Sequence, residues 1–431
     1  MVANVPVETS QGSVTGRTVY IPQMVYAGSR LMAAAFRACG VDARVTPDSN
    51  DETLELGGLH SSGEECLPHK VTLGDFLRIT REPDFDPNKT AFFMPSAPGP
   101  CRFGQYSIYL REVLKAEGLD DVLVFAPDSA DNYGGMGDHA SNLMRYAWMG
   151  LVVAELATRF LLKTRPYETT AGDTDQAFQD TLADLCATHE QQNQKPSEKL
   201  ANLRGAIVRM RERFRAIPAR YVKGRPLIGL VGEIYCRLNT FSNEDTARRV
   251  EQLGGECWLS DICEWVWYTN WARDQDTIRN HGRISLAFLK QKLKTTVQAR
   301  YEHALLQPLH ADLKGYEEPH DIREVLKKSE PYLPATGTHG EMTVSVGKAI
   351  YLYQKGADGI IDISPFTCMN GIVSEAVYPS ISHDHDDIPI RSLYFDKVST
   401  HIDRDLEIFL DLARAYQRRK KTTRVYPDYF E

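Results

Sequence analysis

Three of the eight cysteines share a local sequence that suits metal chemistry. Cys66 lies in residues 63–68 (GEECLP), Cys101 in 98–104 (PGPCRFG) and Cys368 in 364–371 (SPFTCMNG). Cys101 and Cys368 each follow an expected buried strand and precede an expected helix. A helix N-terminus stabilises a thiolate through its dipole and its free N–H groups. Three thiolates that meet at such an edge could hold an iron–sulfur cluster with one iron not bound by cysteine.

The spacing of these cysteines also allows two other interpretations. Cys101 lies 35 residues after Cys66, Cys368 lies 267 residues after Cys101, and the chain contains no CxxC pair. The three residues could be small buried side chains in tight loops. They could also form a zinc site of three cysteines and one histidine, since His69 lies close to Cys66 in the sequence.

Two further residues are candidate catalytic groups. Glu233 lies near the end of an expected strand, at the edge where open α/β sheets bind ligands. It could hydrogen-bond the backbone at a helix N-terminus, or it could donate protons beside a cluster. Tyr235 could likewise have a structural or a functional role. Arg102 directly follows Cys101, so it could balance the negative charge of a cluster or pair with a carboxylate.

Several weaker motifs favour ordinary structural roles. The turn at 336–341 (TGTHGE) precedes an expected helix and could bind phosphate or CoA, with His339 as a proton donor. The run 383–387 (HDHDD) favours a solvated turn over a metal site. We expect the remaining cysteines to be packing residues: Cys39, Cys186, Cys236, Cys257 and Cys263.

The hydrophobic pattern predicts how the chain positions these groups. Short β-branched or apolar runs predict strands at 18–22, 42–46, 90–95, 122–127, 226–234, 256–259, 359–365 and 388–395. They alternate with amphipathic helical segments, which predicts parallel sheets with crossover helices. The expected fold class is therefore α/β, with two Rossmann-like parallel-sheet domains.

The middle of the chain lacks convincing strands and predicts a helical insertion. We place an N-terminal α/β domain at 16–138, the insertion at 139–222 and a C-terminal α/β domain at 223–418, with the cluster site between the two α/β domains. We expect 261–292 to be mostly helical, and Asn243 to be the N-cap of a helix that ends at Leu253. The two α/β halves are too dissimilar in sequence to indicate a duplication.

Composition narrows the class of protein. The chain has 431 residues, a net charge of -8, 25% charged and 42% hydrophobic residues, which is typical of a soluble globular protein of two to three domains. The negative charge argues against a nucleic-acid partner. The chain has no run of 18 apolar residues, so we expect no membrane partner. Residues 1–12 lack the features of a signal peptide, and the sparse cysteines fit a reducing cytosol, so we expect a cytoplasmic protein.

The cysteine strings, together with 225–235 (RPLIGLVGEIY) and 356–360 (GADGI), resemble the 2-hydroxyacyl-CoA dehydratase component family. The CoA activase-related branch is the most similar, whose members occur alone or as the C-terminal part of large activase fusions. The resemblance extends from about Gly16 to Arg418. It implies Rossmann-like domains with a [4Fe–4S] cluster between them, bound by three cysteines that match Cys66, Cys101 and Cys368.

The resemblance also implies an activity and partners. In dehydratase members, an ATP-hydrolysing activase injects one low-potential electron, which reaches a 2-hydroxyacyl-CoA and forms a ketyl radical that loses water. Related members carry a double-cubane cluster and reduce small molecules. This sequence departs from some relatives, because Pro98 stands where they have a further cysteine, and it contains no ATPase phosphate-binding motif.

We therefore expect an iron–sulfur protein that is a lyase or a component of an ATP-dependent reductase. Its expected partners are a separate activase, an acyl-CoA substrate and a homo- or heterodimeric subunit. The alternative hypotheses are a non-redox small-molecule-binding or scaffold module, and a zinc protein.

Overall fold

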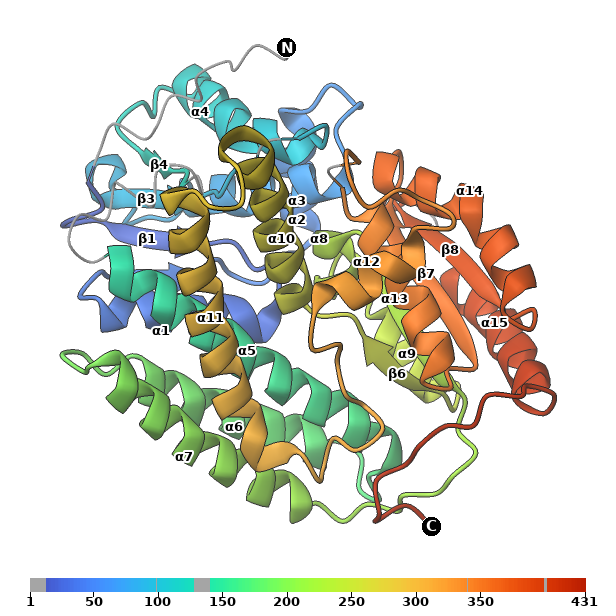
Figure 1. The fold of residues 1–431 in the computed structure, drawn as a ribbon. Coiled ribbons are helices and arrows are strands. Elements are labelled where there is room, and N and C mark those ends of the chain that lie inside the picture. Colours follow the sequence, from blue (N-terminus) through green and yellow to red (C-terminus); the bar gives the residue numbers. More distant parts are fainter. Residues whose placement is uncertain (1–12, 98, 128–139, 339, 399–400) are drawn as a thin grey trace.

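The computed structural model describes residues 13–97, 99–127, 140–338, 340–398 and 401–431, and this part of the chain forms two parallel β-sheets (Figure 1). The first contains β1 (Thr18–Ile21), β2 (Ala43–Val45), β3 (Thr90–Phe93) and β4 (Leu123–Phe125). The second contains β5 (Leu227–Gly232), β6 (Glu256–Leu259), β7 (Gly359–Pro365) and β8 (Ile390–Phe395). Each strand lies within a segment that the sequence predicted as a strand. The α/β class with two parallel-sheet domains is confirmed.

Both sheets have the same strand order, which the weak similarity of the two halves did not indicate. The orders are β2-β1-β3-β4 and β6-β5-β7-β8, and all pairings are parallel. In this topology the chain reverses its winding direction between β1 and β3, and again between β5 and β7. Ligands bind in the crevice outside the carboxyl ends of such a strand pair. Every residue of β5 and β7 is buried, which explains their largely apolar sequence.

The helices cover both faces of each sheet. Those of the first domain are α1 (Tyr26–Ala38), α2 (Asp51–Leu59), α3 (Leu67–Ile79) and α4 (Tyr106–Ala116), with the 3-10 turns η1 (Pro87–Lys89) and η2 (Arg102–Gln105). Those of the second domain are α8 (Ile234–Leu238), α9 (Thr246–Gln252), α12 (Ile322–Ser329), α13 (Met342–Gln354), α14 (Met369–Asp384) and α15 (Ile402–Gln417). Leu67 and Val71 of α3 pack into the core of the second sheet, so this helix joins the two domains.

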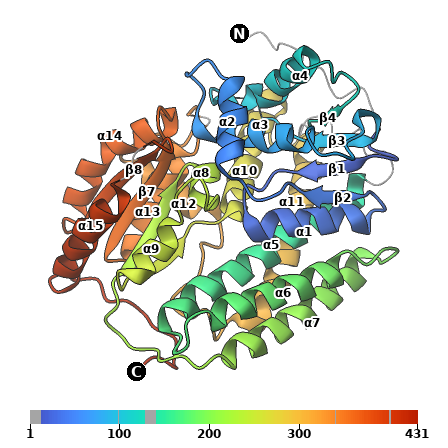
Figure 2. The same ribbon diagram turned by 180° about the vertical axis from the view of Figure 1, so that it is seen from behind.

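The insertion is helical, as predicted. It contains α5 (Ala140–Thr164), α6 (Asp173–His189) and α7 (Pro196–Arg215). The 3-10 turn η4 (Arg165–Tyr167) follows α5 directly. These helices lie beneath α1 and the first sheet (Figure 2) and share one hydrophobic core with them. The predicted boundary at 138/139 lies outside the described residues. No helix within the described ranges has both the length and the apolar composition needed to cross a bilayer.

The prediction that 261–292 is mostly helical is confirmed. Its helical residues belong to α10 (Ile262–His281) and to the start of α11 (Leu286–Leu306), which are separated at Gly282 with its positive φ of 80°; Ser285 begins α11 by accepting a hydrogen bond from Phe288 N. The prediction of Asn243 as an N-cap was wrong, since α9 begins at Thr246. The side-chain oxygen of Asn243 accepts from Thr246 N at 3.3 Å, and its amide donates to the carbonyls of Cys236 and Arg237.

Helices α2 and α3 cross at very short distance, and glycines make this contact. A Cβ atom on Gly74 would lie 1.9 Å from the carbonyl oxygen of Thr53, and one on Gly57 would lie 2.0 Å from that of Lys70. Because backbone atoms block both positions, a side chain there must push the helices apart. The start of α3, which carries Cys66, therefore depends on these two glycines.

We predict that Gly74→Ala lowers the free energy of unfolding by about 1–3 kcal/mol, the usual cost of overpacking. Gly58→Ala in the same helix pair is the matched control, because no atom lies within 4 Å of its added Cβ. The control should leave stability unchanged or raise it by up to about 1 kcal/mol through helix propensity. Urea unfolding of both variants measures the difference, and equal stabilities would contradict the close-contact argument.

His189 is buried at the end of α6 without a charge partner. One ring nitrogen lies 3.0 Å from the carbonyl oxygen of Tyr146, and Lys199 donates to the carbonyl of His189 itself. Burial, and then the nearby Lys199 charge, lower the pKa of His189 to about 3. The unfolded chain protonates this residue below about pH 6.5, whereas the folded chain does not.

The free energy of unfolding should therefore fall as the pH drops from about 6.5 toward 3, by about 1.4 kcal/mol per pH unit for this one proton. His189→Gln should be less stable at neutral pH but should show a shallower loss of stability between pH 7 and 5. His320→Gln, at an exposed position, should keep the parent slope. Urea midpoints at several pH values measure the slopes, and identical slopes for parent and His189→Gln would refute this assignment.

Candidate functional site

The three candidate cysteines each stand at the beginning of a helix. Cys66 precedes α3, Cys101 precedes η2 and Cys368 precedes α14. The sulfur of Cys101 accepts a hydrogen bond from Phe103 N at 3.5 Å, and the backbone of the first turn after Cys66 and after Cys368 lowers the pKa of those thiols against the effect of burial. Each thiol thus lies where backbone N–H groups and the helix dipole stabilise a thiolate.

The guanidinium of Arg102 connects the three cysteine loops. It donates to the carbonyl of Glu64, two residues before Cys66. Its other terminal nitrogen donates to the carbonyl of Thr367 at 2.9 Å and to the hydroxyl of Thr367 at 3.0 Å. Because Arg102 itself follows Cys101, one side chain brings together two loops of the first domain and the Cys368 loop of the second.

Thr367 shows that this connection holds an unfavourable backbone. Its φ of 66° is left-handed, which is strained for a β-branched residue. The two hydrogen bonds from Arg102 stabilise this conformation, which directs Cys368 toward the domain boundary. Arg102 therefore contacts carbonyl and hydroxyl oxygens, and no carboxylate partner of the kind considered from the sequence is found for it among the described residues.

Glu233 follows β5 and caps α8, which is the structural role of the two that the sequence suggested. Its carboxylate accepts hydrogen bonds from Tyr235 N at 3.0 Å and Cys236 N at 2.8 Å. Gly232 makes the turn, with φ of 116° and a Cβ position only 2.2 Å from the carbonyl oxygen of Ile363. Only glycine fits there, so the carboxylate is held firmly at the carboxyl ends of β5 and β7.

A second buried carboxylate, Glu341, lies beside Glu233 and was not predicted from the sequence. It accepts a hydrogen bond from Ile234 N at 3.2 Å. It ends the 336–341 turn, which lies against the start of α14, since a Cβ on Gly340 would be 2.3 Å from the side-chain oxygen of Asn370. This turn is thus part of the same site, although phosphate binding there stays a prediction and His339 lies outside the described residues.

The electrostatics of the site favour neutral acids and thiols. Burial raises the pKa of Glu233, and burial followed by the charge of Glu233 raises that of Glu341 well above its ordinary value. Burial also raises the pKa of Cys66, and that of the Cys368 thiol is raised by burial and then by Glu233. For the Cys101 thiol, withdrawal from water raises the pKa to about 11. Three thiolates here therefore require a positively charged group between them.

Two more side chains at the site were not predicted from the sequence. Tyr106 places its hydroxyl 2.8 Å from the sulfur of Cys66 and is itself buried. Cys236, which we expected to be a packing residue, is fully buried on α8, and its pKa is raised by burial and then by the charge of Glu233, with smaller contributions from Cys368 and Cys66. The sequence offered a weak signal for Cys236, because it lies three residues after Glu233 on the same short helix.

His69, the histidine considered as a zinc ligand, lies between two tyrosine rings. His69 packs between Tyr106 and Tyr109, with ring centroids 4.9 Å apart in both pairs, and burial lowers its pKa to about 4. Within the described ranges, no three His, Cys, Asp or Glu side chains stand close enough to hold one metal ion.

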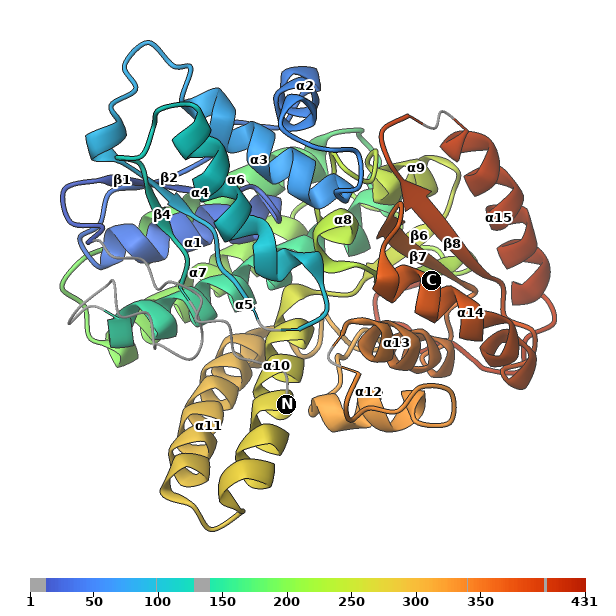
Figure 3. The ribbon, with the colours of Figure 1, turned by 90° about the horizontal axis from the view of Figure 1, so that it is seen from above.

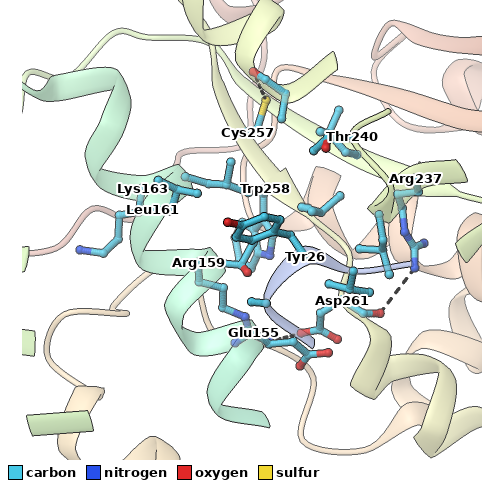
Figure 4. Close-up of a pocket in the computed structure, with 18 of the residues that line it drawn as sticks. Tyr26, Glu155, Arg159, Leu161, Lys163, Arg237, Thr240, Cys257, Trp258 and Asp261 are labelled. Carbon is cyan, nitrogen blue, oxygen red and sulfur yellow. Dashed lines mark hydrogen bonds and ion pairs between the residues drawn. The ribbon is translucent and has the colours of Figure 1, made fainter. Parts of the chain in front are cut away.

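A separate, partly open pocket of about 140 Å³ lies between α5, α8, β6 and the start of α10 (Figure 4). Glu155, Arg159 and Asp261 point toward one another at its wall, and Arg159 pairs with Asp261. Arg159 also lies 3.7 Å from Glu318, which pairs with the buried Lys348 on α13. This charge network joins the insertion to the second domain, and the cavity contains none of the predicted site residues.

No protein-family model matches this chain, and no curated protein matches it. The resemblance to the dehydratase component family therefore rests on the sequence motifs alone.

We predict that Arg102→Lys loosens the cysteine loops, because one ammonium group cannot contact Glu64 and Thr367 together. In protein freed of metal with a chelator, alkylation of Cys368 should accelerate about fivefold, the equivalent of losing one hydrogen bond of ~1 kcal/mol. Arg81→Lys, at an exposed position after α3, is the control and should alkylate at the parent rate. Peptide mass spectrometry over time measures each thiol, and unchanged rates in Arg102→Lys would show that the guanidinium does not hold the loops.

Proposed function

We propose that Cys66, Cys101 and Cys368 hold a [4Fe–4S] cluster, and that the protein is an iron–sulfur component for low-potential reductive chemistry. The observation that supports this most is the contact of Arg102 with the loops before Cys66 and Cys368, directly after Cys101. Through Arg102, the residue after Cys101 contacts the residue before Cys368, 265 positions away in the sequence. A packing role for three cysteines does not require such an arrangement.

The chain's own groups have distinct roles in this proposal. A cluster bound by three thiolates would supply a low-potential electron and one iron with an open coordination position. The backbone N–H groups of the first helical turns stabilise the thiolates, and Arg102 keeps their loops together. Glu233 and Glu341, whose pKa values are raised, hold protons within the site and can donate them to a substrate whose hydroxyl group must leave as water.

The same proposal covers partners and location. A separate ATP-hydrolysing activase would deliver the electron, and a 2-hydroxyacyl-CoA is the substrate class that the sequence resemblance suggests. Phe366, Met369 and Ile372 are exposed beside Cys368 and give the site an apolar border on which such a partner could dock. All eight cysteines are free, which agrees with a reducing compartment such as the cytoplasm.

We predict about four iron and four acid-labile sulfide per chain after anaerobic purification, with a broad absorption band near roughly 400 nm. Serine substitution of Cys66, Cys101 or Cys368 should remove most of the iron and the colour. Cys257→Ser is the matched control, because Cys257 is buried in β6 and its sulfur contacts the carbonyl of Ala247 rather than the site. Cys236→Ser in addition tests whether the nearest buried thiol contributes a ligand.

Other outcomes would decide among the alternatives. About eight iron per chain would indicate a double-cubane cluster. A colourless protein that contains zinc lost on the same three substitutions would support the zinc hypothesis. No metal after anaerobic reconstitution, with unchanged folding of the serine variants, would refute the proposal and favour a non-redox binding module.

A further inference from the structure

Helices α10 and α11 form an arm that projects from the rest of the molecule (Figure 3). Two hydrogen bonds of 2.9 Å hold its base. Trp148 of α5 donates to the carbonyl of Gln298 on α11, and Trp267 of α10 donates to the carboxylate of Glu302 on α11. The segment from residue 279 to residue 300, which extends back to the anchor at Gln298, is called the arm tip below. The anchored base makes the arm a defined element of the fold.

The arm tip exposes an apolar face. Ile284 is 94% exposed, and Leu286, Leu289 and Leu293 are 66%, 58% and 68% exposed. The three leucines are spaced i, i+3, i+7, so they form one stripe along α11. Four large apolar side chains this exposed on one projecting element are typical of an interaction surface.

The arm tip is also strongly basic, in contrast to the rest of the chain. It carries Arg279, Arg283, Lys290, Lys292, Lys294 and Arg300 and no Asp or Glu. Since the whole chain has a net charge of -8, the remainder carries -8 - 6 = -14. Lys292 pairs with Asp274 and Arg279 with Asp276 on α10, so the other cations are the ones available to a partner.

This charge distribution restricts how two copies can associate. Arm tip against arm tip would place like charges together, which is unfavourable. Arm tip against the acidic body of a second copy is complementary. The body offers a matching face on α15, where Ile408 and Leu412 are 52% and 55% exposed.

Carboxylates accompany this apolar face of α15. Asp403, Glu407 and Asp411 are exposed and follow one another at four-residue intervals. Asp403 pairs with Arg249, and Asp411 pairs with Arg414 at 2.9 Å, while Glu407 has no ion-pair partner among the described side chains. Helix α15 carries four carboxylates, Asp403, Asp405, Glu407 and Asp411, against two cations, Arg404 and Arg414, so its net charge is opposite to that of the arm tip.

We propose that this chain forms a two-fold dimer by arm exchange, in which the leucine stripe of α11 in each copy packs on α15 of the other. The exchange is reciprocal, so two contacts close the assembly and leave no open end. It buries the apolar residues of both helices and places the arm cations beside the carboxylates of α15. The proposal is independent of the cluster, because neither helix carries one of the three cysteines.

Sedimentation velocity of the purified full chain at micromolar concentration tests the proposal, and a dimer is expected. Leu289→Glu with Leu293→Glu should give a monomer. Arg283→Glu with Lys290→Glu, and separately Glu407→Lys with Asp411→Lys, should each weaken dimerisation at least about tenfold, since like charges across an interface cost several kcal/mol. Combining the two charge reversals should restore the dimer. Val208→Glu on α7 is the control and should remain dimeric.

Circular dichroism and iron content of every variant separate loss of assembly from loss of folding or of the cluster. A parent chain that is monomeric would overturn the proposal. So would a dimer that survives the leucine substitutions, or charge reversals whose combination fails to restore association, since either result would place the interface elsewhere.

Discussion

The candidate site depends on one interaction, the hydrogen bonds of the Arg102 guanidinium to backbone carbonyls of both domains. A guanidinium has five donors in a fixed plane, so it can join loops that have no complementary side chains. Here it reaches Glu64 and Thr367, which lie 38 and 265 positions away in the sequence. The three loops each lead into a helix N-terminus and therefore present N–H donors to one another. Arg102 bonds to carbonyl oxygens of two of these loops.

The neighbourhood of the cysteines is governed by a second constraint, the cost of buried negative charge. Glu233 and Glu341 lie together away from water, and their raised pKa values show that the protein environment disfavours two carboxylates there. The thiols experience the same effect. A cationic iron–sulfur core would stabilise the charged forms of these groups. The helix N-termini of α3, α8 and α14 supply partial positive charge to the same region.

The rest of the fold holds the two domains in a fixed relation. Helix α3 begins at Cys66, crosses α2 through the glycine contact at Gly74 and inserts Leu67 and Val71 into the second core. On the other side, the buried pairs of Arg159 with Asp261 and of Lys348 with Glu318 connect the insertion to α10 and α13. Breaking one partner of such a pair would leave a buried charge, which is strongly unfavourable. Both features keep the cysteine loops at a constant distance from one another.

Much of this could be predicted from the sequence. Strands that are buried on both faces, such as β5 and β7, are largely apolar, and short apolar runs between helical segments identified all the strands of both sheets. Local motifs made Cys66, Cys101 and Cys368 candidate ligands, and its place at a strand end made Glu233 a candidate, because these signals are contained in a few neighbouring residues. The helical content of 261–292 was predicted as well, but the sequence did not specify the break at Gly282, since one glycine in a helical pattern does not by itself end a helix.

Only the tertiary structure decided which distant residues meet. Glu341 contacts the start of α8 from 107 positions away, Cys236 lies beneath the site, and Arg102 reaches Thr367 across the domain boundary. From the sequence, Arg102 was expected to balance the charge of a cluster or to pair with a carboxylate; the carbonyl and hydroxyl groups to which it donates carry no sequence signature. Side chains select such partners through the packing of whole domains, so their pairing is a property of the folded chain rather than of any local pattern.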